Sequence, residues 1–271
     1  MNLSAPSKEK ALRPIHPNVG IEIEFRRRLT KLIEEMAAST EYWISAAHRG
    51  SPPEVAELAQ DELSSAALRE AMRKLAKRWN ERFDDAAQKL ASYFSQSIGK
   101  RSDAVLRKIL KDGGFSVEFK MTRAMRDVMN ATISEQVGLI KSIPQQFLTN
   151  VEGIVMRGVT TGRDLGAIST ALQEQLGVTK RRAAFIARDQ SNKATASMTR
   201  VRQLEIGLTE AVWVHSGGGA HPRPTHLKAG RDKQRYDIAK GWYDPAVGEF
   251  IWPGMLPNCR CVSRPVVKGF S

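Results

Sequence analysis

Cysteine is scarce in this 271-residue sequence, which has only Cys259 and Cys261, separated by a single residue. A disulfide framework needs distant cysteine pairs that staple loops together, so the sequence excludes one. A bond between these two cysteines would close a small strained ring, which we do not expect in a reducing compartment. The fold must therefore be stabilised by its hydrophobic core, or by a role of these two cysteines other than a disulfide bond.

Long apolar runs are also missing. No stretch approaches the roughly 18 consecutive apolar residues that indicate a membrane-spanning helix, and residues 1–20 lack the apolar core of a signal peptide. We therefore expect no membrane partner. We also expect a protein that is made and kept in a reducing cytoplasm unless it leaves inside a particle.

Several catalytic patterns are absent as well. The sequence has no Walker-type phosphate loop, no dinucleotide fingerprint after a predicted strand and no His-Glu-x-x-His. Either cysteine could form a nucleophile and base pair with His226. However, a cysteine flanked by Pro257, Arg260 and a second cysteine matches no hydrolase pattern. We predict no catalytic residues and a protein that is not an enzyme.

Positive charge, in contrast, is in excess. Lys and Arg number 42 against 29 Asp and Glu, which gives a net charge of +13 and a pI near 10.0. Such a field favours polyanions, and the alternative is solubility without a specific partner. Because the cations are spread along the chain, they suit contact with a nucleic-acid backbone better than sequence-specific recognition of bases. The candidates for polyanion contact are Arg26, Arg27, Arg28, Lys100, Arg101, Arg107, Lys108, Lys111, Lys180, Arg181 and Arg182.

Helical spacing of apolar residues dominates the first three quarters of the chain. We expect helices at 21–48, 51–98, 102–111, 117–143, 145–156, 164–176 and 180–206, the last capped by Gly207. A short strand is expected at 211–215, followed by a segment rich in Pro, Gly, Trp and Tyr. The predicted fold class is mainly α, with long N-terminal helices and a small, loop-rich C-terminal α+β module.

Three groups of residues follow one another in order in the C-terminal part of the chain. They are Ile186-Ala187-Arg188-Asp189-Gln190, Arg223-Pro224-Thr225-His226 and Asn258-Cys259-Arg260-Cys261, with Gly207 and Trp213 between the first two. This ordered set resembles the phage Mu F-like and SPP1 gp7-like head-morphogenesis (minor capsid) proteins, over about the last 125 residues. One departure is Gly217-Gly218-Gly219-Ala220, which stands where the family commonly has an acidic turn.

The resemblance and the helical pattern suggest three regions. We predict a flexible arm at 1–20, a helical assembly region at 21–142 and the head-morphogenesis module at 143–271. The resemblance implies a non-enzymatic minor capsid protein of the virion. Its implied partners are the portal protein, scaffold or major capsid protein at the portal vertex or inner capsid face, in multiple copies, with non-specific contact to packaged DNA. Before assembly it would reside in the host cytoplasm.

Four potential zinc ligands occur in the predicted module: His221, His226, Cys259 and Cys261. Imidazole and thiolate are preferred zinc ligands, and a closed structural site needs four. Against this, Cys-x-Cys is tighter than the usual spacing, and His221 precedes a proline. The alternatives are two small buried cysteines with His226 hydrogen-bonded across the module, or a redox or catalytic role. A zinc-stabilised module also suits a rival function, that of a free nucleic-acid-binding protein.

Overall fold

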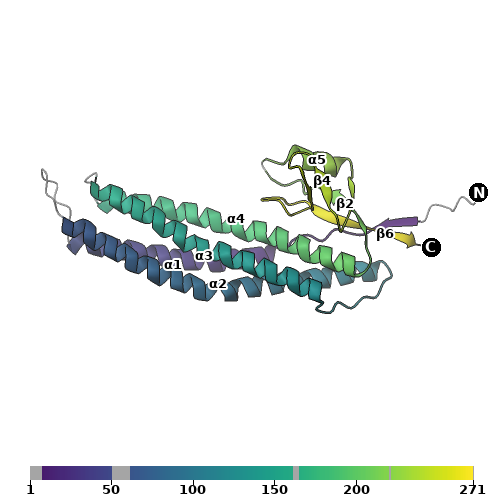
Figure 1. Cartoon of the computed structure of the whole chain (residues 1–271), viewed down its shortest axis with the longest axis horizontal. Coiled ribbons are helices and arrows are strands. Elements are labelled where there is room, and N and C mark those ends of the chain that lie inside the picture. The colour runs from purple at the N-terminus through teal and green to yellow at the C-terminus, as the bar shows by residue number, and fades with distance from the viewer. Residues whose placement is uncertain (1–7, 51–61, 161–164, 220, 271) are drawn as a thin grey trace, which may run out of the picture. The chain divides into compact units, whose positions relative to one another are not determined.

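The computed structural model describes residues 8–50, 62–160, 165–219 and 221–270. Strand β1 (Lys8–Ala11) is followed by four long helices: α1 (Val19–Gly50), α2 (Glu62–Asp112), α3 (Arg123–Thr160) and α4 (Leu165–Glu205). Short elements follow: β2 (Glu210–Val214), α5 (Pro224–Arg231), β3 (Arg235–Asp237), β4 (Trp242–Asp244), β5 (Glu249–Ile251) and β6 (Val262–Phe270). The predicted fold class is confirmed: the protein is mainly α with a small C-terminal α+β part (Figure 1).

Three predicted helix ends are wrong, because α2 runs through Gly99, α3 through Pro144 and α4 through Gly177. The predicted start of the second helix at Ser51 lies outside the described residues. The end of α4 agrees with the prediction, since Gly207 adopts a φ of +78° and the amide of Leu208 donates to the carbonyl of Gln203.

Packing explains why α2 and α3 continue. A Cβ on Gly99 would lie 3.1 Å from the Met129 side chain and 3.5 Å from that of Met198, so this glycine permits close approach and does not end the helix. Proline inside a helix costs roughly 3 kcal/mol. Around Pro144, the buried side chains of Ile140, Ile143 and Phe147 offset that cost.

The chain divides into two compact units. The first, which we call the helical unit, comprises Ile23–Ser92 and Ser134–Ala187. Its core consists of large apolar side chains with no exposed surface or almost none: Leu29, Ile33, Met36, Trp79, Phe83, Phe147 and Val151. Ion pairs such as Arg82–Glu35 and Lys180–Glu34 lie at its surface. Burial of apolar helix faces therefore accounts for most of its stability.

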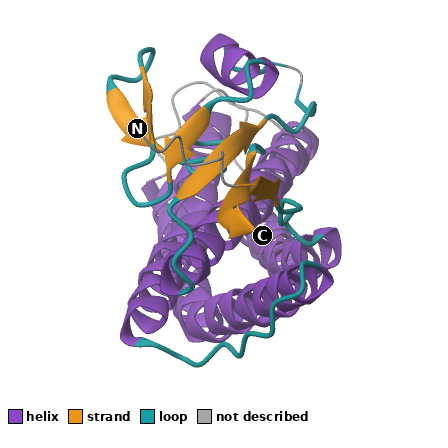
Figure 2. Ribbon diagram, turned by 90° about the vertical axis from the view of Figure 1, so that its right-hand side faces the viewer, coloured by secondary structure: helices purple, strands orange, loops and turns teal. Residues whose placement is uncertain are grey.

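The second unit comprises Met1–Glu22, Tyr93–Ile133 and Arg188–Ser271. Within it, the antiparallel strands follow the order β1-β6-β2-β3, where β1 is Lys8–Ala11, and β4 and β5 form a separate hairpin (Figure 2). Trp213 and Tyr236 share a hydrophobic core with Leu106 and Leu110 of α2. We call residues 206–270 the C-terminal module.

Residues 8–20 differ from the loose arm that was expected. Strand β1 pairs with β6, and the amide of Leu12 donates to the carbonyl of Pro265 at 2.9 Å. Leu12 and Ile15 are buried. Two apolar side chains among polar residues and prolines are thus enough to fix this segment on the sheet.

A buried ion-pair network joins three segments of the second unit. The guanidinium of Arg202 on α4, with only 3% of its side chain exposed, binds both carboxylate oxygens of Asp103 of α2 at 2.8 Å and one of Glu205 at 2.7 Å. It also donates to the carbonyl of Lys120 at 2.7 Å. Four acceptor contacts satisfy a charge that would otherwise be costly to bury.

Candidate metal centre

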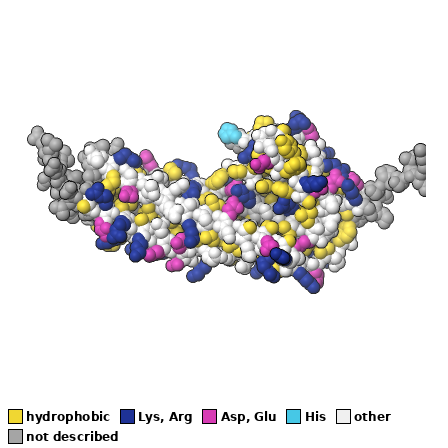
Figure 3. Space-filling view, viewed as in Figure 1, with side chains coloured by type: hydrophobic (Ala, Val, Ile, Leu, Met, Phe, Trp, Pro, Cys, Tyr) yellow, Lys and Arg dark blue, Asp and Glu magenta, His cyan; other side chains and the backbone are white. Residues whose placement is uncertain are grey.

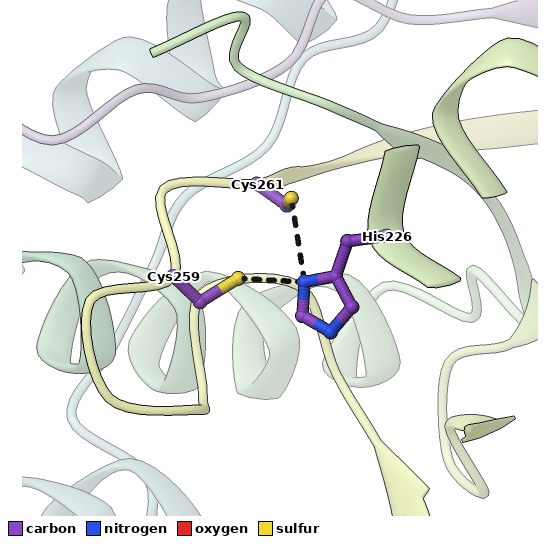
Figure 4. Close-up of side chains that lie close together, drawn as sticks. All are labelled: His226, Cys259 and Cys261. Carbon is purple, nitrogen blue, oxygen red and sulfur yellow. Dashed lines mark hydrogen bonds between the residues drawn. The ribbon is translucent and has the colours of Figure 1, made fainter. Parts of the chain in front are cut away.

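Three potential metal ligands converge in the C-terminal module. His226 lies on α5, and Cys259 and Cys261 lie in the segment that leads into β6 (Figure 4). The Nδ1 atom of His226 is 3.5 Å from the Sγ atom of Cys259 and 3.8 Å from that of Cys261. The three ligand atoms lie within 4.8 Å of one another, and all three residues are at most 4% exposed.

The start of α5 and a buried carboxylate orient His226. Pro224 fills the first helical position, where its missing N–H costs nothing. Asp244, which is fully buried, lies with Oδ2 3.4 Å from His226 Nε2 and accepts a hydrogen bond from the Thr225 hydroxyl at 3.2 Å. Trp213 packs edge-on against the imidazole, with ring centroids 4.9 Å apart. The ring is therefore held with Nδ1 toward the two sulfur atoms.

Helix α4 positions the loop that carries the cysteines. Asn258 adopts a φ of +60°, and its amide donates to Asp189 Oδ1 at 2.8 Å. Arg188 contacts the Asn258 side chain at 3.5 Å, and Arg223 donates to the carbonyl of Pro257 at 3.0 Å. The three motifs that were recognised in the sequence thus meet at one turn, which explains why they occur together.

The pKa values of the two thiols are shifted in opposite directions. A hydrogen bond from Cys261 lowers the pKa of Cys259, and contacts with His226 and the Gly254 amide lower it further, against the effect of burial. The same hydrogen bond and burial raise the pKa of Cys261. The pair therefore favours one shared proton, and metal binding requires the release of that proton.

The three clustered side chains could hold a metal ion, and they are three of the four ligands that a closed structural zinc site needs. Zn–N and Zn–S bonds of about 2.0 and 2.3 Å at tetrahedral angles place N and S ligands about 3.5 Å apart, close to the 3.5 and 3.8 Å in the structure. An acceptor on the other ring nitrogen of the histidine is a usual feature of zinc sites. Asp244 Oδ2 lies 3.4 Å from that nitrogen, near enough for such a role, although Nε2 makes no hydrogen bond in the structure. A Cys–His–Asp relay uses one thiol, whereas here two sulfur atoms face the same nitrogen, which favours a metal over a nucleophile.

Sequence reasoning included His221 and missed Asp244. His221 is exposed and does not belong to the cluster among the described residues, although it lines a pocket of about 250 Å³ that also reaches His226, Cys259 and Cys261. Asp244 lies in Trp242-Tyr243-Asp244-Pro245, where no local pattern distinguishes it from a turn aspartate. Only the hairpin of β4 and β5 brings it under α5.

The eleven predicted polyanion contacts have different surroundings. Arg27 and Arg28 pair with Glu24, Lys180 pairs with Glu34, and Arg182 is half-buried and binds Ser142. The remaining seven are exposed: Arg26, Lys100, Arg101, Arg107, Lys108, Lys111 and Arg181. On the face drawn in Figure 3, basic and acidic side chains are interspersed along the helices.

One group of these cations forms a continuous surface on α2. At 100° per residue, Lys100, Arg107 and Lys111 lie within about 40° of one another, and Arg101 and Lys108 lie about 90° around the helix. We call these five residues the basic face of α2; all are exposed. No helix in the described ranges is both long and apolar enough to cross a membrane.

Comparisons with known proteins agree with the arrangement of the motifs. Residues 149–264 match the family described as "Phage Mu protein F like protein". An uncharacterized protein of Haemophilus influenzae (strain Rd) is 25% identical over 263 residues, which cover 96% of this chain but only 56% of that relative. The chain therefore spans little more than half the length of the curated relative it matches. No solved structure matches significantly. The match contains all three motifs and all three clustered ligands, and the segment 149–264 belongs to the phage Mu F-like head-morphogenesis family.

Proposed function

We propose that this chain is a minor head protein that joins the capsid during prohead assembly, through the portal protein, scaffold or major capsid protein. One observation carries the proposal: the family match over residues 149–264 coincides with the region where three sequence motifs converge on one turn. In this role the protein resides in the host cytoplasm during assembly and then in the virion head, in multiple copies, without catalytic activity.

The test is incorporation. Purified full-length protein is mixed with proheads or with isolated portal protein at moderate salt and sedimented. We expect the full chain to co-sediment with the assembly. Failure to bind portal, scaffold and shell alike, together with absence from purified virions, would overturn the proposal.

For packaged DNA, we propose contact through the basic face of α2. Its five exposed cations are spread along a helix, which suits the repeating phosphates of a nucleic-acid backbone. Replacing Lys100, Arg107 and Lys111 by Gln should weaken DNA binding and reduce its salt dependence. The same change at Arg27, Arg28 and Lys180, which already pair with carboxylates, should have less effect.

The same test separates the rival function, a free nucleic-acid-binding protein. Tight DNA binding by the isolated protein with a steep salt dependence, combined with no affinity for proheads, would favour that rival. Weak, non-specific DNA binding together with prohead binding supports the assembly role.

We also propose that His226, Cys259 and Cys261 bind zinc. The metal would supply a rigid link between α5 and β6 in a module whose strands β3, β4 and β5 have only three residues each. Asp244 holds the imidazole orientation, and Asp189 and Arg188 hold the turn before the cysteines. His221, the fourth ligand that the sequence predicts, is exposed and lies outside the three-residue cluster, so it is not part of the proposed set. Elemental analysis of the reduced protein tests the proposal, which requires about one zinc per chain.

A further inference from the structure

The pocket beside the candidate metal centre is lined by three arginines from three different segments. Arg188 comes from α4, Arg223 from the residue before α5, and Arg260 from between the two cysteines. All three are half-buried. The described lining residues include no Asp or Glu, so the pocket has a net positive charge in its walls.

These arginines are only partly used by the protein itself. Arg188 and Arg223 contact the Asn258 side chain and the Pro257 carbonyl, and the Nε of Arg188 is buried without a hydrogen-bond acceptor. None of the three joins an ion pair with a described carboxylate. The nearest acidic group along the chain, Asp189, is already engaged by Lys193 and the Asn258 amide. Each guanidinium has five N–H donors, so these contacts leave most of the hydrogen-bonding capacity of the three arginines unfilled.

The local backbone favours this convergence. A Cβ on Gly218 would lie 3.2 Å from Nη1 of Arg260, so the glycine lets this guanidinium approach the loop closely. The Gly217-Gly218-Gly219 turn has no acidic side chain, so it leaves the charges of the arginines to an external group.

From this geometry we propose that the pocket binds a carboxylate projecting from a partner protein, an Asp or Glu side chain of an acidic segment. Three arginines that line one pocket suit an oxyanion, which guanidiniums bind through charge-assisted, bidentate hydrogen bonds. A pocket of about 250 Å³ admits a single side chain. A nucleic-acid backbone instead presents a row of phosphates, which the basic face of α2 matches better. The site would give the assembly role proposed above a specific contact, but it does not depend on zinc.

The probes are two blocked tripeptides, Gly-Asp-Gly and its neutral match Gly-Asn-Gly, titrated into the full-length protein. Binding is followed by NMR at the Gly218 amide and the arginine Nε–H signals. We expect saturable shifts with the aspartate peptide and none with the asparagine peptide. Equal shifts with both peptides, or none with either, would overturn the proposal while leaving prohead incorporation untouched.

Variants then test the arginines. Arg260→Gln should weaken binding of the aspartate peptide by about tenfold, because one charge-assisted contact is lost. Arg264→Gln removes the same charge from an exposed position on β6 outside the pocket, and its affinity should match that of the wild type. Equal affinity in Arg260→Gln would contradict the site. If Arg260→Gln reduced binding of a 12-base-pair DNA duplex and not of the peptide, the pocket would be a nucleic-acid contact instead.

Discussion

The helical unit and the C-terminal module build their cores from different chemistry. In the helical unit, long helices bury Leu29, Phe83 and similar side chains, and charges stay at the surface. In the module, His226, Asp244 and the two cysteines are as buried as Trp213 and Tyr236. Apolar contacts tolerate exchange of one side chain for another of similar volume, whereas a polar cluster works only when each partner is present. The module should therefore be the more fragile region.

The largest expected effect is the loss of metal from the module. Structural zinc in small modules contributes on the order of 10 kcal/mol of apparent binding free energy. A strong chelator should abolish the near-ultraviolet circular dichroism of the packed Trp213 and Trp242. The far-ultraviolet helix signal should remain, because the helical unit has its own core.

The control is the double variant Cys259→Ser/Cys261→Ser, whose spectrum should not respond to the chelator. Retention of the tryptophan signal in chelator-treated wild-type protein would contradict this prediction.

A smaller loss is expected when one partner of a buried ion pair is removed. Arg202→Ala removes the buried guanidinium and leaves the partly exposed carboxylates of Asp103 and Glu205 without their charge-assisted hydrogen bonds, which should lower the free energy of unfolding by about 2–3 kcal/mol. Arg73→Ala breaks an exposed pair with Glu70 that solvent screens, and it should leave the free energy of unfolding nearly unchanged. Urea denaturation of both variants makes the measurement; similar values for the two would refute the argument.

Two glycines should respond in opposite directions. A Cβ on Gly230 would lie 2.4 Å from the Cβ of His215 and 3.0 Å from its backbone nitrogen, so Gly230→Ala should destabilise the module by about 1–3 kcal/mol. A Cβ on Gly138 meets nothing within 4 Å on an exposed face of α3, so Gly138→Ala should stabilise the helical unit by about 1 kcal/mol. Thermal denaturation, with near- and far-ultraviolet signals recorded separately, measures both changes in stability. Changes of the same sign in the two variants would contradict the prediction.

The smallest effect is expected at His221. Because its side chain is exposed and outside the three-residue cluster, His221→Ala should change zinc affinity by no more than about threefold, or less than 1 kcal/mol. His226→Ala should abolish binding. Competition against a metal-sensitive dye measures both. A loss at His221 as large as that at His226 would mean that the glycine turn carries His221 to the metal, as the sequence predicts.

The sequence predicts the fold class, the capping role of Gly207 and three residues of the cluster. It does not reveal that α2, α3 and α4 continue through Gly99, Pro144 and Gly177, because glycine and proline preferences are local and the packing that overrides them is not. Asp244 and the arginine pocket are missed for the same reason. Their partners lie 18 or more residues away in the sequence, and only the folded chain brings them together.

The pairing of β1 with β6 sets the order in which the molecule can be completed. Ala11 is opposite Val266, roughly 255 positions later in the chain. During translation at about 5–20 residues per second, the four long helices emerge well before β6, while β1 waits without its neighbour. Apolar helix faces can meet as soon as they leave the ribosome, but the sheet closes only after the last strand is made. Maturation of the module is thus a late event, and any partner that recognises its pocket can distinguish a chain whose sheet has closed from one whose sheet is still incomplete.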